Sequence, residues 1–278
     1  MQGCCYGYFS LSMHLLSIVL INYHDATCIQ NNNFKEIKMP YLKWISDADL
    51  ENEVSKILNT ASTAIQKATT LFNQNVIDPF SIMFEMTGFN IATVNAWETN
   101  EKSRKAQKTL SNTFGIFHQS ILGHVNGWVD LGTGKSADLL CVKGKIIAEI
   151  KNKYNTVKGS SKVTVYEDLE SLIMPIASKY HGYTAYYVET IPQPKRKKPQ
   201  VYNVEFTPSN NKTKTLKAAN LKIRKIDGKS FYALVTGDQN ALSDLYKILP
   251  TVIQKLSGKA IGNTEITIMK NYFQKAFV

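Results

Sequence analysis

One stretch of the chain constrains the fold more than any other: "ADLLCVKGKIIAEIKNKYNT", residues 137–156. Its two apolar runs flank a turn at residues 143–144, which predicts a hairpin of two core strands. The second run nevertheless ends in charged side chains, at Glu149, Lys151 and Lys153. Because side chains alternate between the two faces of a strand, these three project together while the residues between them turn away. The chain must therefore build a buried sheet that carries a charged face at one end.

Amphipathic helices are expected around this hairpin. Apolar residues recur at three- and four-residue spacing over 49–72 and again over about 97–125, which predicts two long helices before the first clear strand. The segment "FSIMFEM" between them is expected to form a short helix or a buried segment. After the hairpin, we expect a helix at 165–180 and a buried strand at 183–191. This order predicts an α/β fold in which helices flank a mixed central sheet.

The C-terminal part is strongly basic. Residues 195–229 contain eleven Lys or Arg against only Glu205 and Asp227, a local excess of nine. The segments "VYNVEF", "LKIRKI" and "SFYALVTG" are expected to be strands, the last two joined by a turn at Asp227-Gly228. An amphipathic helix is expected at 238–256. We therefore expect a basic, β-rich C-terminal region and a helical N-terminal part.

Charge and composition restrict the class of partner. The 278 residues carry a formal net charge of +11, and all of the excess lies in residues 39–278. A basic body with 44% hydrophobic residues favours a polyanionic partner, with nucleic acid first and an anionic membrane surface second. Gly134-Lys135-Ser136 lacks the preceding glycine of a phosphate-binding loop, so ATP-dependent chemistry is not supported. The four cysteines lack metal-ligand spacing, and their usage fits a reducing cytoplasm.

The first 38 residues differ from the rest of the chain. Their apolar stretch at 9–21 is short for a membrane span, and no Lys or Arg precedes it as one would in a signal peptide. A signal peptide is the weaker alternative, and we expect residues 1–38 to be a non-functional extension without a membrane role. The main domain is then expected to consist of a helical part, a core and a basic region with a closing helix, at 39–136, 137–191 and 192–278.

The charged face suits one kind of chemistry. If the hairpin pairs as expected, Asp138 lies near Glu149, with the ammonium group of Lys151 beside them. Hard divalent cations such as Mg²⁺ take oxygen ligands, and a bound ion can hold a phosphodiester and lower the pKa of an attacking water. We therefore expect these three residues to be catalytic and both carboxylates to be metal ligands. Glu85 is a further candidate ligand, although a partnered or exposed carboxylate explains it at least as well.

At these residues the sequence resembles the PD-(D/E)xK nuclease superfamily. The superfamily's pattern is an acidic residue followed, after a short interval, by acid-x-Lys on the next strand. Here the pattern reads Asp138 and then Glu149-Ile150-Lys151, and the expected elements follow the superfamily's αβββαβ order. One departure is that Ala137 stands where the superfamily has a proline, a residue that ligates nothing.

A closer resemblance extends from about Met39 to the C-terminus. The segments "MPYLKWISDADLENEVSKIL", "DPFSIMFEMTGF", "FGIFHQSILG", "LGTGKSADLLCVKGKIIAEIKNKYNT" and "GYTAYYVETIP" are similar to type II restriction endonucleases that cut GGNCC and GGWCC sites. The resemblance implies magnesium-dependent double-strand cleavage of DNA at a short palindrome by a homodimer. It also implies a cognate DNA methyltransferase that protects the host DNA.

Several basic residues are candidates for contacts with DNA phosphates. They lie beside the charged face or in the basic region: Lys153, Lys195, Arg196, Lys197, Lys198, Lys222, Arg224 and Lys225. Two other functions stay open from the sequence. One is a repair or junction nuclease of the same fold that reads DNA shape, and the other is a non-catalytic DNA-binding protein in which the acids pair with lysines.

Overall fold

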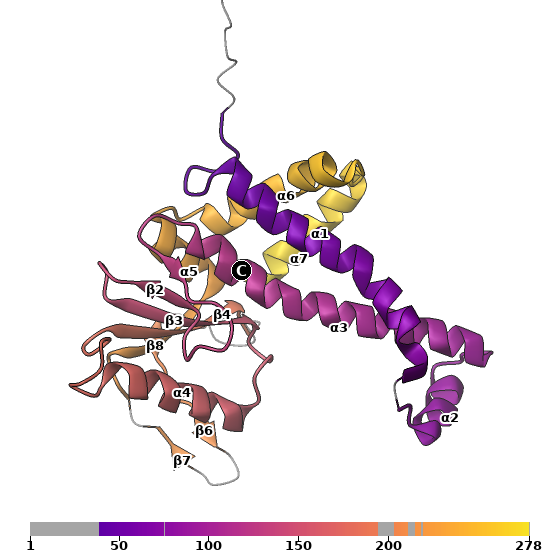
Figure 1. Cartoon of the computed structure of the whole chain (residues 1–278), viewed down its shortest axis with the longest axis horizontal. Coiled ribbons are helices and arrows are strands. Elements are labelled where there is room, and N and C mark those ends of the chain that lie inside the picture. Colours follow the sequence, from indigo (N-terminus) through magenta and orange to yellow (C-terminus); the bar gives the residue numbers. More distant parts are fainter. Residues whose placement is uncertain (1–38, 75, 194–202, 211–214, 218, 278) are drawn as a thin grey trace, which may run out of the picture. The chain divides into compact units, whose positions relative to one another are not determined.

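The computed structural model describes residues 39–74, 76–193, 203–210, 215–217 and 219–277 (Figure 1). Pro40–Val278 forms one compact unit. The helices are α1 (Asp47–Thr70), the short 3₁₀ helix η1 (Phe72–Gln74), α2 (Pro79–Gly88), α3 (Val94–Gly123), α4 (Gly159–Ile173), α5 (Gly228–Thr236), α6 (Ala241–Ser257) and α7 (Asn263–Phe277). The strands are β1 (Val129–Asp130), β2 (Leu139–Cys141), β3 (Ile146–Lys153), β4 (Thr184–Ile191), β5 (Val204–Glu205), β6 (Ser209–Asn210), β7 (Thr215–Leu216) and β8 (Ile223–Asp227).

A mixed six-stranded sheet forms the centre of this unit. Its strand order is β1-β2-β3-β4-β8-β5, in which β3, β4 and β8 are parallel and the other neighbours are antiparallel. Parallel neighbours need a crossover connection, and α4 supplies the one between β3 and β4. The strands β6 and β7 form a separate two-stranded ribbon that contacts α4.

Helices cover both faces of the sheet and divide the core in two. On one face, α3 and α5 pack over β3 and β4, and α1 runs alongside α3. The larger cluster there includes Phe117, Ile121, Ala148, Val188 and Phe231. On the opposite face, α4 packs over β4 and β8. The smaller cluster there includes Ile147, Tyr166, Leu169, Tyr187 and Phe206. Alternation along β3 thus sends Ala148 to one core and Ile147 to the other.

The predicted α/β class, the two long helices and the hairpin are confirmed. Helix α1 begins after Ser46, whose hydroxyl oxygen accepts a hydrogen bond from the Asp49 N–H, and α3 begins after the corresponding cap, Thr93. Strands β2 and β3 flank the predicted turn. The predicted strand at 183–191 corresponds to β4, in which Tyr186 and Tyr187 are core residues. None of the helices in the described part of the chain is both long and apolar enough to cross a membrane.

The expectation of a strand at 230–237 is wrong, because residues 230–236 belong to α5 and Gly237 is the C-cap of that helix. Asp227 does not lead into a hairpin turn; instead its carboxylate accepts a hydrogen bond from the Ser230 N–H at 3.0 Å and caps the helix. Aromatic and β-branched residues suggested a strand, yet they lie on one helical face and fill the core against β4. Gly228 allows this packing, since a Cβ there would lie 2.4 Å from the Thr190 carbonyl oxygen.

Two further expectations need correction. The C-terminal region is not β-rich, because its described part consists mainly of α5, α6 and α7 with short strands. The helix expected at 165–180 spans 159–173 instead. Met174 still has right-handed helical dihedral angles, and the helix ends there because Pro175 has no N–H to donate to the carbonyl oxygen of the preceding turn.

Candidate active site

Asp138 is held tightly between two strands. It directly precedes β2, and its backbone N–H donates to the Ala148 carbonyl oxygen at 2.8 Å, which continues the antiparallel pairing with β3. Its side-chain Oδ2 accepts a hydrogen bond from the Ile150 N–H at 2.6 Å. The carboxylate is therefore oriented by the backbone of the strand that carries Glu149 and Lys151.

Glu149 and Lys151 occupy alternate positions near the end of β3 and share the face covered by α4. The Lys151 ammonium group forms an ion pair with Glu149 Oε1. Both side chains are mostly buried, with exposed fractions of 15% for Glu149 and 24% for Lys151. The structure thus brings together the three residues that the sequence singled out as catalytic, at the site where antiparallel β2 meets β3.

The two carboxyl groups lack sufficient compensation for their negative charge. Burial and the neighbouring negative charge of Asp138 raise the pKa of Glu149 to about 7, although Lys151 acts in the opposite direction. Burial also raises the pKa of Asp138, opposed by the Ile150 N–H and by Lys151. One lysine is therefore shared by two desolvated acids, and a cation between them would relieve the repulsion.

The donor set fits Mg²⁺. Mg²⁺ takes oxygen ligands, commonly one or two carboxylates, and retains several waters. Asp138 and Glu149 supply two carboxylates, and their raised pKa values indicate a site that lacks positive charge. Within the described residues, no group of three or more His, Cys, Asp or Glu side chains is arranged to enclose a metal ion. Such an enclosure is typical of structural zinc, whereas a hydrated magnesium ion does not need it.

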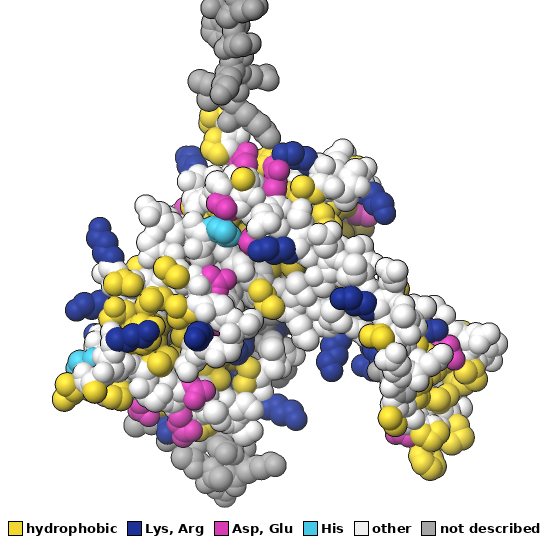
Figure 2. Space-filling view, in the orientation of Figure 1, with side chains coloured by type: hydrophobic (Ala, Val, Ile, Leu, Met, Phe, Trp, Pro, Cys, Tyr) yellow, Lys and Arg dark blue, Asp and Glu magenta, His cyan; other side chains and the backbone are white. Residues whose placement is uncertain are grey.

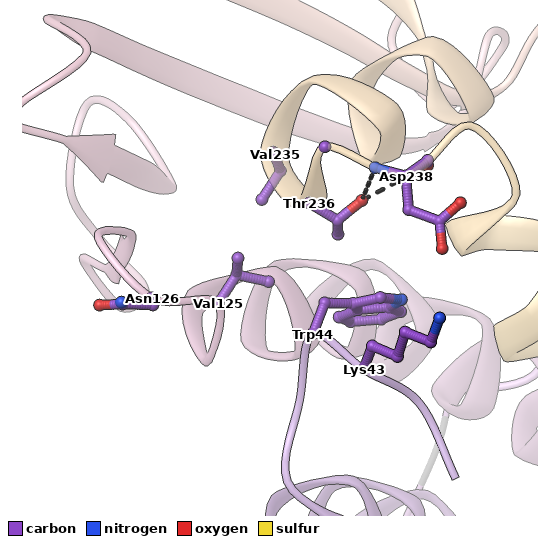
Figure 3. A pocket seen from close by; sticks show the side chains of 8 residues that line it. Lys43, Trp44, Val125, Asn126, Val235, Thr236 and Asp238 are labelled. Atoms are coloured by element: carbon purple, nitrogen blue, oxygen red, sulfur yellow. Dashed lines mark hydrogen bonds between the residues drawn. The ribbon is translucent and has the colours of Figure 1, made fainter. Parts of the chain in front are cut away.

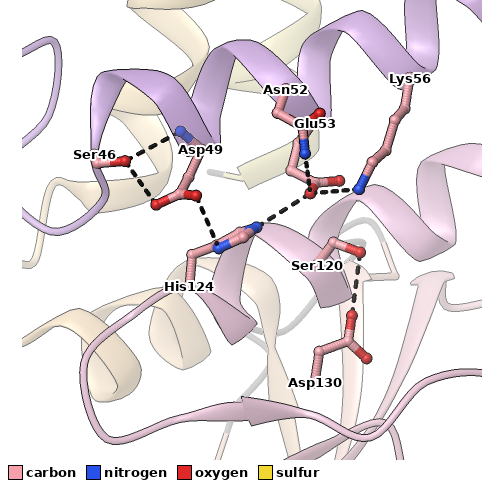
Figure 4. Close-up of polar contacts among 8 residues, drawn as sticks. All are labelled: Ser46, Asp49, Asn52, Glu53, Lys56, Ser120, His124 and Asp130. Atoms are coloured by element: carbon pink, nitrogen blue, oxygen red, sulfur yellow. Dashed lines mark hydrogen bonds and ion pairs between the residues drawn. The ribbon is translucent and has the colours of Figure 1, made fainter.

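A second layer of polar groups supports Asp138 from α3. Gln119, which is buried, donates from Nε2 to Asp130 Oδ1 at 2.6 Å and approaches the Asp138 carbonyl oxygen at 3.5 Å. The Ser120 hydroxyl donates to Asp130 Oδ2 at 3.1 Å, as Figure 4 shows. The close approach of α3 to β1 requires Gly123, since a Cβ there would lie 2.6 Å from the Asp130 Cβ. Neither Gln119 nor Asp130 was identified from the sequence as part of the site, because no motif marks either residue.

Beyond Lys151, the same face continues onto β4 and α4. Lys151 is paired in register with Glu189, which is almost fully buried. Glu189 forms ion pairs with Lys162 at 2.6 Å and with Lys225 at 3.7 Å. Glu189 was not among the metal ligands expected from the sequence, and both of the ion pairs that it forms are with lysines. Lys162 was not identified as a candidate, because its partner lies 27 positions away in the chain.

Glu85 lies elsewhere in the protein. It is on α2, where its Oε2 accepts a hydrogen bond from the Trp97 indole N–H at 2.7 Å. Trp97 is near the start of α3 and Gln119 is near its end, 22 residues later, a separation of about 33 Å along a helix. Glu85 therefore does not join the carboxylates of Asp138 and Glu149, and the alternative of a partnered carboxylate describes it.

The candidate DNA contacts fall into three groups. Lys153 is exposed at the end of β3, and Lys225 lies on the Glu149 face through its ion pair with Glu189. Arg224 points to the other face and donates from Nε to Asn203 Oδ1 at 2.6 Å, while Lys222 is exposed just before β8. The remaining candidates lie outside the described residues: Lys195, Arg196, Lys197 and Lys198.

Two histidines lie on the α3 side of the sheet, away from Glu149. His124 contacts Glu53, with 3.1 Å between Nε2 and Oε1, and helps to join α3 to α1 (Figure 4). His118 Nδ1 lies 2.8 Å from the Tyr232 hydroxyl, and burial lowers the pKa of His118 to about 4. The hydrogen bonds of both histidines join helices on this side of the sheet and do not involve Asp138, Glu149 or Lys151.

A pocket of about 420 Å³ lies on this same side (Figure 3). It is lined by Lys43 and Trp44 before α1, by Val125 and Asn126 after α3, and by residues 235–238 at the end of α5 and just beyond it. None of these residues belongs to the Asp138–Glu149–Lys151 cluster. The candidate active site is therefore separate from this pocket and lies on the opposite face of the sheet, which α4 covers.

Comparison with known proteins identifies the family. The sequence model of the Eco47II restriction endonuclease family matches residues 42–257. The chain belongs to the Eco47II restriction endonuclease family. It is 44% identical over 240 residues to the type II restriction enzyme Eco47II of Escherichia coli, covering 86% of this chain and 98% of that protein. It is 28% identical over 214 residues to the type II restriction enzyme Sau96I of Staphylococcus aureus, covering 77% of this chain and 80% of that protein.

Family membership confirms the resemblance to type II restriction endonucleases drawn from the sequence. An Eco47II-family chain with this coverage is a type II restriction endonuclease, a site-specific deoxyribonuclease. The matched region contains the whole of β2, β3, α4 and β4, and therefore the complete candidate active site.

Proposed function

We propose that this endonuclease cuts both strands of DNA at a short palindromic GGNCC-like site, with Mg²⁺ as cofactor and as a homodimer. The observation that carries the proposal is the convergence of Asp138, Glu149 and Lys151 on one face at the β2–β3 edge. The chain order α3-β1-β2-β3-α4-β4 around this edge supports assignment to the PD-(D/E)xK superfamily.

Asp138 and Glu149 would hold the magnesium ion. Bound there, the ion would polarise the scissile phosphodiester and lower the pKa of the attacking water. Asp138 keeps its orientation because the Ile150 N–H holds one of its oxygens. Gln119, which is held by Asp130, contacts the backbone carbonyl oxygen of Asp138 and helps to position this residue.

Lys151 would act on water and phosphate. In the structure its ammonium group is paired with Glu149. When Glu149 acts as a ligand, Lys151 can orient the attacking water and balance the charge that develops on the phosphorus-centred transition state. Lys151 lies two residues after Glu149 on the same rigid strand, so the two groups would stay close when Glu149 binds the metal ion and Lys151 turns to the water and the phosphate.

The DNA backbone would lie along the lysines that border the site. Lys153 and Lys225 extend the positive charge from Lys151 on the same face, and Lys222 is a further exposed lysine just before β8. We include Lys195, Arg196, Lys197, Lys198 and Arg224 as further phosphate contacts. The net charge of +11 supports an electrostatic, salt-dependent component of binding. We further propose that the enzyme acts in the cytoplasm alongside a cognate methyltransferase.

Plasmid digestion tests this function. Unmethylated plasmid with several GGNCC sites is incubated with the full chain and Mg²⁺, Ca²⁺ or EDTA, and the fragment ends are read by run-off sequencing. We expect discrete fragments with Mg²⁺ only, and protection of the same plasmid after methylation of the sites. Intact plasmid under all Mg²⁺ conditions contradicts the proposal, and cutting that ignores sequence favours the repair or junction nuclease.

Lys151→Ala provides the residue-level test, with Lys143→Ala as a control on the exposed turn of the same hairpin. Lys151→Ala should lower the cleavage rate by about 10³-fold or more, since it removes a charge that acts in the transition state, while DNA binding in Ca²⁺ stays within a few-fold. Lys143→Ala should cut normally. Full activity of Lys151→Ala would remove this residue from the mechanism.

A further inference from the structure

The paired helices α1 and α3 carry a small separate structure at their far end (Figure 1). We call residues 76–97, which include α2 and the start of α3, the tip. Phe72, which precedes the tip, makes an edge-on contact with the Trp97 ring, and the ring centroids are 6.5 Å apart. Within the tip, the hydrogen bond from the Trp97 indole N–H to Glu85 ties α2 to the start of α3. The tip is therefore held in place, although it contributes little to the main core.

The tip exposes an unusual amount of apolar surface. Helix α2 contains no buried residue, although its sequence is strongly hydrophobic. In Figure 2, hydrophobic side chains gather over this end of the molecule. The most exposed members of the patch are Val76 (102%), Phe80 (68%), Met83 (59%), Phe84 (77%), Phe89 (72%) and Val94 (52%).

The size of this patch indicates a protein interface. A phenylalanine that buries its ring fully removes about 150–250 Å² from water, so the three exposed rings alone present roughly 400 Å². With the aliphatic side chains, the patch exceeds the few hundred Å² that soluble monomers usually expose. A DNA backbone would leave these rings in contact with charged phosphates, whereas another apolar surface would bury them.

We propose that the tip docks onto the tip of a second copy of this chain. A twofold interface places the same patch on both sides, and such self-complementarity suits an apolar surface. Two facing tips would bury on the order of 1,200 Å² in total, which is the lower end for a stable, specific interface. The inference rests on the proposed function in one respect, since a palindromic site is matched by two protein copies related by a twofold axis.

The polar rim of the patch also favours a second copy. A pocket of about 330 Å³ that includes Val76 borders the patch and is lined by side chains of both signs, among them Asp78, Glu101, Arg104 and Lys105. Glu101 is already paired within the chain with Arg104 at 2.6 Å and with Lys105 at 3.8 Å, so the charges of the rim nearly balance. Such a surface does not repel its own copy across a twofold axis, as a surface of one sign would. The rim is thus compatible with self-association.

Mass measurement of the full chain tests the inference. Sedimentation equilibrium at micromolar concentration should give twice the mass of one chain for the wild type. The double variant Phe80→Ser/Phe84→Ser should raise the dimer dissociation constant at least about 100-fold and sediment as a monomer with an unchanged circular dichroism spectrum. The control is Ile176→Ser, which changes an equally exposed apolar side chain outside the tip and should remain a dimer.

A photocrosslinking residue, p-benzoylphenylalanine, in place of Phe84 identifies what covers the tip. We expect a crosslinked product of two chains, with position 84 joined to residues of the partner's tip. A monomeric wild type, a double variant that remains dimeric, or a crosslink only within one chain or to DNA would each overturn the inference. Plasmid digestion separates the two proposals: a wild type that dimerises through the tip without cutting DNA would reject the proposed function and leave the interface standing.

Discussion

Glu149→Gln should make the metal-free protein more stable, although it should abolish cleavage. Glu149 has a pKa of about 7 in the folded protein against an ordinary value of 4.5, because it is buried beside Asp138. Its protonated form therefore stabilises the fold fully below pH 4.5, and this contribution is lost as the pH rises to 7. At about 1.4 kcal/mol per pH unit, the ionised carboxylate costs on the order of 3 kcal/mol at pH 8. Glutamine has the same shape and carries no charge, so it removes this cost.

Urea unfolding in EDTA measures the effect across pH. The difference in free energy of unfolding between Glu149→Gln and wild type should be near zero at pH 4.5. It should reach about 3 kcal/mol in favour of the variant at pH 8, which corresponds to a rise of roughly 6–12 °C in Tm. The control is Glu167→Gln, which removes a half-exposed partner of Lys217 and should change stability by less than about 1 kcal/mol at either pH. Adding Mg²⁺ should stabilise the wild type and not Glu149→Gln. A variant that is less stable than wild type at pH 8, or whose gain does not depend on pH, would refute the reasoning.

Three further predictions concern the surroundings of the site. Burial lowers the pKa of His118 to about 4 from an ordinary 6.5. As the pH falls from 6.5 to 4, the free energy of unfolding of the wild type should therefore decrease by up to about 3 kcal/mol relative to that of His118→Gln. A difference in urea unfolding that does not depend on pH would contradict this. Glu189→Ala should lower the free energy of unfolding by about 3–5 kcal/mol, because it leaves the partly buried Lys162 ammonium group without its carboxylate partner. Glu189→Gln should lower it by less in the same urea unfolding assay. Gly123→Ala should displace Asp130, because the added Cβ would lie 2.6 Å from the Asp130 Cβ; we expect a lower cleavage rate with unchanged DNA binding, and wild-type rates would show that Asp130 does not support the site.

Local sequence patterns were sufficient to predict the two long helices and the common face of the three candidate catalytic residues. The helical repeats predicted α1 and α3 to within a few residues, because one apolar face of a helix is written at regular spacing in the sequence. Strand alternation and a short turn placed Asp138, Glu149 and Lys151 on a common face, since the distance between β2 and β3 in the chain is small. The family resemblance depended on the same local segments, and the comparisons confirm it.

Only the tertiary structure decided the conformation of residues 228–236 and the contacts between segments that are distant in the sequence. Residues 228–236 have the composition of a strand. Both edges of β8 are already paired, with β4 on one side and β5 on the other, so a following strand could not pair with it as a hairpin. The chain continues instead as α5, which Asp227 caps. The pairing of Glu189 with Lys162 and the support of Asp138 by Gln119 join segments that only the sheet register and the packing of α3 bring together. Glu85 was a candidate ligand by type but lies at the far end of α3. Sequence spacing reports which face of its own element a residue occupies, whereas its neighbours on other elements depend on how those elements pack.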